Sequence, residues 1–90
     1  MSTSAAGGTG TPIRSPAALG RAVRRARRAA GLTQTELAQR ARSNRYAIAL
    51  IEAGHETRAI EQLFDALAAL DLELAVRPRR RSGAGERHGA

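Results

Sequence analysis

The chain has 90 residues, a net charge of +7 and no cysteine, so it fits one small domain without disulfides or thiolate metal sites. All fifteen of its basic residues are arginine. Nothing in the sequence resembles a transmembrane span or a signal peptide, and we therefore expect a cytoplasmic protein without a membrane partner.

Both ends of the chain have a composition typical of disordered tails. Residues 1–14 are small, polar and rich in glycine, and residues 78–90 contain no large apolar residue. Neither segment can bury enough surface to offset the entropy lost on ordering it. We therefore expect a disordered N-terminal tail, a single folded domain over residues 15–77 and a disordered basic C-terminal tail. A domain of that size is only marginally stable by itself, which favours an obligate partner.

The charges divide the chain into a basic first half and an acidic second half. Residues 19–50 hold eight arginines and one acid, Glu36, whereas residues 51–77 hold six acids and two arginines. A one-sided basic surface on a small domain is typical of proteins that bind nucleic acids. Arginine also suits paired hydrogen bonds to phosphate and guanine. The sequence is equally consistent with a simpler interpretation of the run from Arg21 to Arg28, namely an ordinary solvated helix face.

The first predicted helix begins at Ser15-Pro16, since serine is a favoured N-cap and proline fits the first helical position. Gly31 ends it, in the position that favours left-handed backbone. Its apolar residues recur at steps of three and four: Leu19, Val23, Ala26 and Ala30.

The second predicted helix begins with a capping box. The Thr33 side chain can accept a hydrogen bond from the amide of Glu36, and the Glu36 side chain can reach back to Thr33. Gln34 lies in the first turn, next to unpaired amides that favour an anion such as a DNA phosphate. The alternative for Gln34 is an ordinary exposed glutamine.

The third predicted helix runs from Arg45 to about Ala53, with Asn44 as its cap, after a short turn at Arg42-Ser43. We expect Ile48 and Ile51 on its inner face, which leaves three residues near its start on the outer surface: Arg45, Tyr46 and Ala49. Arg45 could donate two hydrogen bonds to a guanine, and Tyr46 could contact a phosphate or a thymine methyl. The alternative for Tyr46 is a partly buried core residue. Two short helices joined by a tight turn predict a helix-turn-helix whose second helix enters the DNA major groove.

The loop after this motif contributes Arg58 as a further candidate contact to the DNA backbone. Glu52, His55 and Glu56 form the only cluster that could suggest a metal site, and we expect no metal and no cofactor. No nucleophile, base and orienting acid can be assembled from the core, so we do not expect an enzyme.

A fourth predicted helix and a strand complete the domain. The helix carries a wide apolar stripe: Ile60, Leu63, Phe64, Leu67, Ala68 and Leu70. Residues 72–77 then switch to period two, with Leu72, Leu74 and Val76 on one side of a strand that ends before Pro78. The chain offers no second strand, so we expect two copies to pair these strands antiparallel across a two-fold axis and to bind a near-palindromic operator. The alternative is a strand-like tail that lies against its own helix.

The segments GLTQTELAQRA and SNRYAIALIEAG, followed by IEQLFDALAALDLEL, resemble the Xre/Cro family of helix-turn-helix DNA-binding proteins over about residues 19–77. The most specific motif is Leu-Thr-Gln-x-x-Leu-Ala, starting at Leu32. The ending ETRAIEQLFDALAALDLEL is similar to HipB-like antitoxin regulators. The chain departs from the family at Arg42, where glycine or asparagine is usual, and at Ser43, where an apolar residue is usual.

This resemblance implies an all-α, lambda-repressor-like bundle of four or five helices, with a short C-terminal strand that pairs between the subunits of a homodimer. It also implies a sequence-specific transcriptional regulator that represses its own operon and binds a kinase-like toxin encoded beside it. The candidate residues for binding double-stranded DNA are Thr33, Gln34, Asn44, Arg45, Tyr46, Ala49 and Arg58. Two other functions stay open: an interaction module that neutralises a toxin through the acidic half, with DNA binding secondary or lost, and RNA binding, which the scarcity of aromatic residues disfavours.

Overall fold

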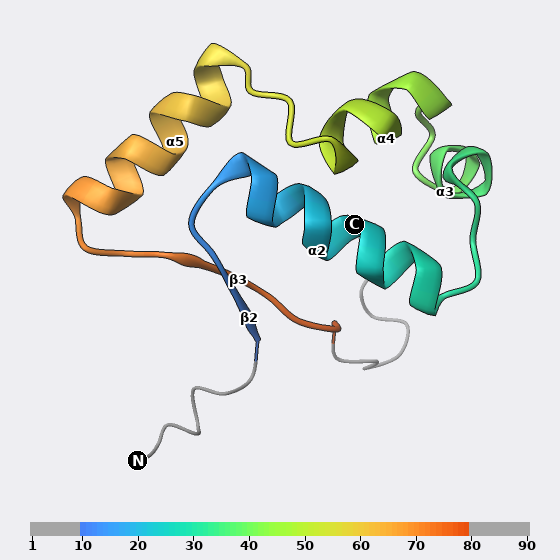
Figure 1. Cartoon of the computed structure of the whole chain (residues 1–90), viewed down its shortest axis with the longest axis horizontal. Coiled ribbons are helices and arrows are strands. Elements are labelled where there is room, and N and C mark those ends of the chain that lie inside the picture. Colours follow the sequence, from blue (N-terminus) through green and yellow to red (C-terminus); the bar gives the residue numbers. More distant parts are fainter. Residues whose placement is uncertain (1–9, 80–90) are drawn as a thin grey trace.

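The computed structural model describes residues 10–79, which form four helices and one small sheet (Figure 1). The elements are β2 (Thr11–Ile13), α2 (Pro16–Ala29), α3 (Gln34–Arg40), α4 (Arg45–Glu52), α5 (Arg58–Ala69) and β3 (Leu74–Val76). The four helices lie where the sequence predicts them, so the mostly helical class is confirmed. Among the residues described, no helix combines the length and the apolar character needed to cross a membrane.

All four helices begin in the same way. The side chain of the residue before each helix accepts a hydrogen bond from the backbone amide three residues later, over 2.9 to 3.2 Å. These N-caps are Ser15, Thr33, Asn44 and Thr57. At α3 the capping box is complete, because the Thr33 amide also donates to Glu36 Oε1 over 2.8 Å.

The four helices are also terminated alike, because a residue with positive φ lies two positions after the last residue of each helix: Gly31, Arg42, Gly54 and Asp71. The amide of the next residue then donates to the carbonyl five residues before it, over 2.8 to 3.1 Å. This bond satisfies a carbonyl that the helix itself leaves unpaired. Glycine adopts this backbone conformation without strain, whereas Arg42 and Asp71 do so at a steric cost.

β3 has its partner strand in the same chain, so the prediction of an unpaired strand that requires a second copy is wrong. β2 and β3 pair antiparallel in the register Thr11–Val76, Pro12–Ala75 and Ile13–Leu74. The observed strand is also shorter than the predicted span 72–77, and it leaves Leu72 outside the ladder with 56% of its surface exposed. The pairing was missed because β2 is only three residues long and contains a proline, which gives no recognisable strand pattern.

The N-terminal boundary of the folded unit also differs from the prediction. Ile13, assigned to a disordered tail, is 1% exposed and is the most completely buried large side chain described. Arg14 Nε donates to Glu73 Oε1 over 2.6 Å and links the end of β2 to the segment before β3. Ordered structure is therefore present from Thr11 and not only from Ser15. The remainder of the two predicted tails, residues 1–9 and 80–90, lies outside the described residues.

The core around α2 is small. The buried hydrophobic residues among those described are Ile13, Ala22, Ala38 and Ile48. α2 lies in the middle of the molecule, with α5 on one side and α3 and α4 on the other (Figure 1). A Cβ on Gly20 would lie 2.4 Å from the carbonyl oxygen of Ile51, so the absence of a side chain there allows α2 and α4 to approach closely.

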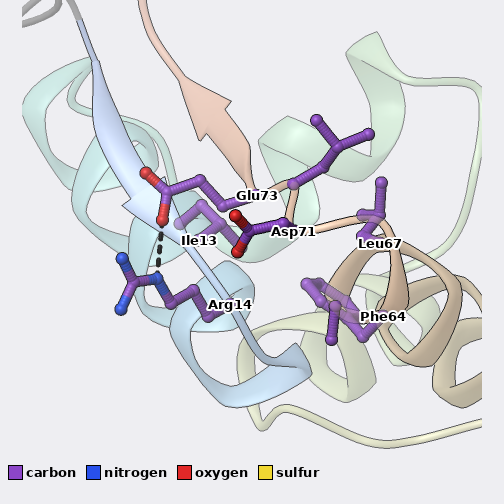
Figure 2. A pocket seen from close by; sticks show the side chains of 8 residues that line it. Ile13, Arg14, Phe64, Leu67, Asp71 and Glu73 are labelled. Atoms are coloured by element: carbon purple, nitrogen blue, oxygen red, sulfur yellow. Dashed lines mark hydrogen bonds and ion pairs between the residues drawn. The ribbon is translucent and has the colours of Figure 1, made fainter.

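A groove of about 710 Å³ separates the sheet from α5 (Figure 2). Ile13 and the Arg14–Glu73 ion pair form one wall, and Phe64 and Leu67 of α5 form the other. Phe64 and Leu67 are therefore on the face of α5 that is turned towards the sheet.

Candidate nucleic-acid interface

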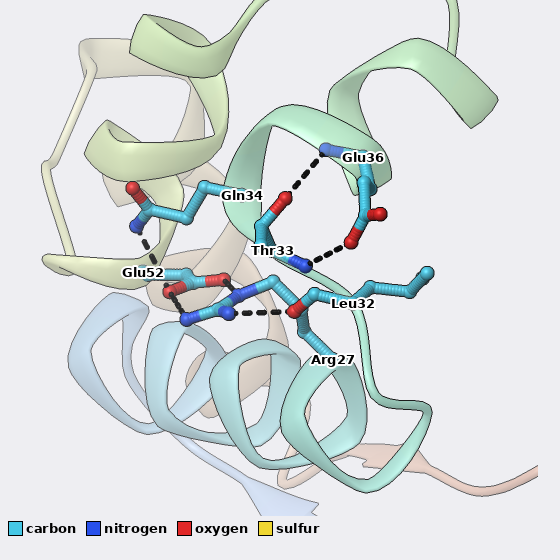
Figure 3. Close-up of polar contacts among 6 residues, drawn as sticks. All are labelled: Arg27, Leu32, Thr33, Gln34, Glu36 and Glu52. Atoms are coloured by element: carbon cyan, nitrogen blue, oxygen red, sulfur yellow. Dashed lines mark hydrogen bonds and ion pairs between the residues drawn. The ribbon is translucent and has the colours of Figure 1, made fainter.

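α3 and α4 are held together by one polar network whose centre is the carboxylate of Glu52 (Figure 3). Arg27 of α2 donates to it twice, from Nε to Oε2 over 2.6 Å and from Nη2 to Oε1 over 3.0 Å. Gln34 Nε2 donates to Oε1 over 3.2 Å, and Arg27 Nη1 donates to the carbonyl oxygen of Leu32 over 2.9 Å. The network thus ties the last turn of α2 to the segment before α3, to the first residue of α3 and to the end of α4.

The Arg27–Glu52 pair is shielded from solvent. Only 11% of the Arg27 side chain and 4% of the Glu52 side chain are exposed. The hydrogen bonds from Arg27 keep the pKa of Glu52 below its usual value of 4.5, with smaller contributions in the same direction from Gln34 and from the charge of Arg24. The carboxylate is therefore ionised at neutral pH, and breaking the pair would leave a charge without its partner.

Thr33 and Gln34, two candidate DNA contacts, have structural roles at the start of α3. The Thr33 hydroxyl accepts from the amide of Glu36, and the Gln34 amide group donates to Glu52. The backbone amide of Thr33 donates to the Glu36 carboxylate, and this bond is the leading cause of a lowered pKa for Glu36. Gln34 is half-buried, so it is not the freely exposed glutamine that was the alternative interpretation. Its position is fixed, with one amide hydrogen used by Glu52.

Asn44, Arg45 and Tyr46 stand together at the start of α4. Asn44 Oδ1 accepts from the amide of Ala47 over 2.9 Å, so this side chain is engaged as the cap. Arg45 is exposed, and Tyr46 is 71% exposed. The alternative of a partly buried tyrosine is therefore wrong. A guanidinium and a phenol thus lie next to each other on the solvent side of a short helix.

The inner and outer faces of α4 differ in part from the sequence-based prediction. Ile48 is buried, as expected, but Ile51 is 43% exposed. Ala49 and Leu50 are half-buried, so Ala49 does not lie fully on the outer surface. Only the first turn of α4 consequently presents large polar side chains to solvent. Arg58, the remaining candidate, is exposed at the first position of α5, outside the α3–α4 unit.

The arginines of α2 divide into two groups that the sequence alone does not separate. Arg27 is bonded to Glu52, whereas the other four are exposed: Arg21, Arg24, Arg25 and Arg28. Sequence reasoning missed the role of Arg27 because its partner is 25 residues away and no local pattern distinguishes it within the arginine run. The exposed four add positive charge to the half of the chain that contains α3 and α4.

Comparisons of the chain with protein families, with curated proteins and with solved structures gave no match.

Proposed function

We propose that the chain is a sequence-specific DNA-binding transcriptional regulator, in which α3 and α4 act as a helix-turn-helix and α4 enters the major groove. The observation that carries the proposal is the adjacent exposure of Arg45 and Tyr46 at the start of α4. A helix N-terminus with an arginine and a tyrosine can reach base edges and phosphates without moving the rest of the helix. The proposed role is the binding of DNA.

The rigid support of α4 favours the same proposal. The helix that enters the major groove must keep a fixed angle to the helix that contacts the DNA backbone. Glu52 of α4 helps to fix this angle, because it accepts hydrogen bonds both from Arg27 of α2 and from Gln34 of α3. The exposed arginines of α2 supply long-range attraction to phosphate, while the acidic groups are concentrated in the second half of the chain. The resemblance to Xre/Cro proteins suggests the same function and a near-palindromic operator bound by a homodimer.

The direct test uses the upstream region of the protein's own gene in a competition gel-shift assay. Arg45→Ala should cost about 1–3 kcal/mol of specific binding and relax the preference at one base pair. Arg14→Ala is the matched control, because it also removes one arginine, but from the ion pair with Glu73 at the sheet. If Arg45→Ala and Arg14→Ala had the same effect on operator preference, the assignment of α4 as the reading helix would be wrong.

We propose further, from the resemblance to HipB-like regulators, that the protein is the antitoxin and autorepressor of a toxin–antitoxin operon. The acidic half gives this second role a surface of its own. The pKa of Glu61 is raised, chiefly by a hydrogen bond with Glu56 and by that carboxylate's charge, so carboxylates gather at the start of α5. A toxin with a basic contact surface would relieve this repulsion. Purification from the native host should then recover the product of the adjacent gene, and its absence would refute the antitoxin role while leaving DNA binding intact.

A further inference from the structure

The groove between the sheet and α5 contains one charged side chain without a partner. Three charged residues line it: Arg14, Asp71 and Glu73. Arg14 and Glu73 neutralise each other, because Arg14 Nε lies 2.6 Å from Glu73 Oε1. The carboxylate of Asp71, in contrast, forms no hydrogen bond or ion pair with another residue of the described range 10–79. The groove therefore presents one uncompensated negative charge.

The backbone of Asp71 makes this carboxylate costly to keep. Asp71 has φ of 60°, a left-handed conformation that strains residues with a side chain and leaves glycine unstrained. Gly31 and Gly54 occupy the corresponding positions after α2 and α4. Strained residues gather at functional sites. An aspartate in this conformation, whose carboxylate bonds to nothing in the described part of the fold, therefore indicates a role in binding.

The rest of the groove is lined mostly by apolar side chains. Phe64 and Leu67 are half-buried and turned towards it from α5, and the buried Ile13 lies on the side of the sheet (Figure 2). Leu72, next to Asp71, is 56% exposed. The volume of about 710 Å³ lies within the range of small-molecule sites, about 300–1,000 Å³. A groove with a large apolar lining and one free charge is suited to an amphipathic ligand.

The charges around the groove select the sign of that ligand. Glu61 and Asp65 are exposed on α5, and residues 51–77 as a whole hold six acids and two arginines. The potential near α5 is therefore negative, although the complete chain carries a charge of +7. A cation would be attracted to the groove, and an anion would be repelled by Asp71 and by the neighbouring carboxylates.

We propose that this groove binds a small organic cation, namely an amine with an alkyl or aryl body. Its ammonium group pairs with Asp71 and lies close to the ring of Phe64, whose face attracts cations. Its apolar body covers Leu67 and Leu72 and removes their surface from water. The site uses no residue of α3 or α4, so the inference does not rest on the proposed function.

Three compounds that share one apolar body test the charge of the ligand. They are 4-phenylbutylamine, 4-phenylbutanol and 4-phenylbutyrate, which at neutral pH are a cation, a neutral molecule and an anion. Titrations of the full chain followed by amide chemical shifts should give a dissociation constant of about 1 mM for the amine. The alcohol should bind about fivefold more weakly, and the butyrate more weakly still. Equal affinities for the amine and the butyrate would overturn the proposal.

Asp71→Asn tests the assigned carboxylate. Asparagine has nearly the same shape and tolerates left-handed backbone, so the fold should be retained. The variant should remove the fivefold advantage of the amine and leave the affinity for the alcohol unchanged. Asp65→Asn is the matched control, because it removes the same charge from an exposed position of α5 outside the lining of the groove. Equal effects of the two variants would show that general acidity, and not Asp71, attracts the amine, and would refute the site.

Leu72→Ala tests the apolar side of the groove. Because Leu72 is largely exposed, its truncation should spare the core, and circular dichroism would establish that the helices are kept. The variant should weaken the amine and the alcohol alike, by about fivefold. Unchanged affinities for both compounds would contradict the placement of the apolar body.

A protein partner could offer similar chemistry through an arginine flanked by leucines. A leucine–arginine–leucine peptide is therefore included in the titrations. Binding of this peptide, with no binding of the amine up to its solubility limit, would overturn the assignment to a small molecule. Gel shifts on the same protein keep the two conclusions apart: a chain that binds the amine but no DNA would refute the regulator and leave this site in place.

Discussion

Arg42 shows how one residue can carry a backbone conformation that its type disfavours. It ends α3 with φ of 57°, where its counterparts Gly31 and Gly54 end α2 and α4 with φ of 73° and 75°. The amide of Ser43 donates to the carbonyl of Ala38 over 2.8 Å and holds the turn in place. Compared with glycine, the arginine at this position therefore adds strain to the turn between α3 and α4 without changing its geometry.

Relief of this strain should be measurable. Arg42→Gly should raise the free energy of unfolding by about 1 kcal/mol, because a side chain in left-handed backbone costs roughly that much. Arg21→Gly, the same exchange at an exposed position inside α2, should instead lower it by about 1 kcal/mol, since glycine destabilises the interior of a helix. Urea unfolding of both variants provides the comparison. A loss of stability on Arg42→Gly would mean that the arginine side chain makes a compensating contact.

At the level of elements, the network around Glu52 connects α2, α3 and α4 through hydrogen bonds. Glu52→Gln would leave Arg27 shielded without its counter-charge and should destabilise the domain by about 3 kcal/mol. The pKa of Glu52 is lowered in the folded state, so its contribution is complete above the usual value of 4.5 and is lost as the pH falls through the folded value.

Unfolding followed from pH 7 to acid should therefore show a loss of wild-type stability below about pH 4.5 that is weaker in Glu52→Gln. Parallel pH profiles for the two proteins would contradict this account of the pair. Gln34→Ala should weaken DNA binding for all sequences alike, because Gln34 is a candidate contact to phosphate and not to bases. It should also loosen the start of α3, because Gln34 donates a hydrogen bond to Glu52.

β2 and β3 make the N-terminal segment part of the fold. Ile13→Ala should lower the free energy of unfolding by about 3 kcal/mol, since it removes the largest completely buried side chain described. Ile51→Ala removes the same atoms from a residue that is 43% exposed, and it should cost less than about 1 kcal/mol. Thermal unfolding of the pair tests whether β2 is structural. Equal costs would indicate that Ile13 contributes no more than a surface residue.

At the level of the whole molecule, charge is separated between the basic α2–α4 half and the acidic half that contains α5 and β3. Three arginines follow β3 at positions 79–81, of which only Arg79 is described. Their charge can add attraction to phosphate without reading bases, or it can serve solubility alone. Both functions are compatible with the sequence.

Deletion of residues 79–90 should distinguish attraction to phosphate from a role in solubility alone. If the arginines contact DNA, the slope of log affinity against log salt should become shallower by about 1 to 3, while the preference for the operator stays the same. Deletion of residues 82–90, which keeps all three arginines, is the control and should leave the slope close to that of the full chain. An unchanged slope after the longer deletion would assign the segment to solubility.

The sequence by itself determined the helices and their boundaries. Ser15, Thr33 and Asn44 were recognisable as caps because an N-cap satisfies amides only two or three residues away, so its signal is local. Gly31 marked the end of the first helix for the same reason. The exposure of Arg45 at the start of α4 also followed from local periodicity.

Only the tertiary structure decided what depends on residues far apart in the chain. The partner of β3 proved to be β2, and the partner of Arg27 proved to be Glu52, although no spacing rule connects either pair. The inward position predicted for Ile51 was wrong because periodicity gives the faces of a helix but not how much of each face its neighbours cover. The same limit hid the exposed side of α5. The helical pattern placed Leu63 and Leu70 in one apolar stripe with Phe64, and only the packing showed that Phe64 borders the sheet while the two leucines remain exposed.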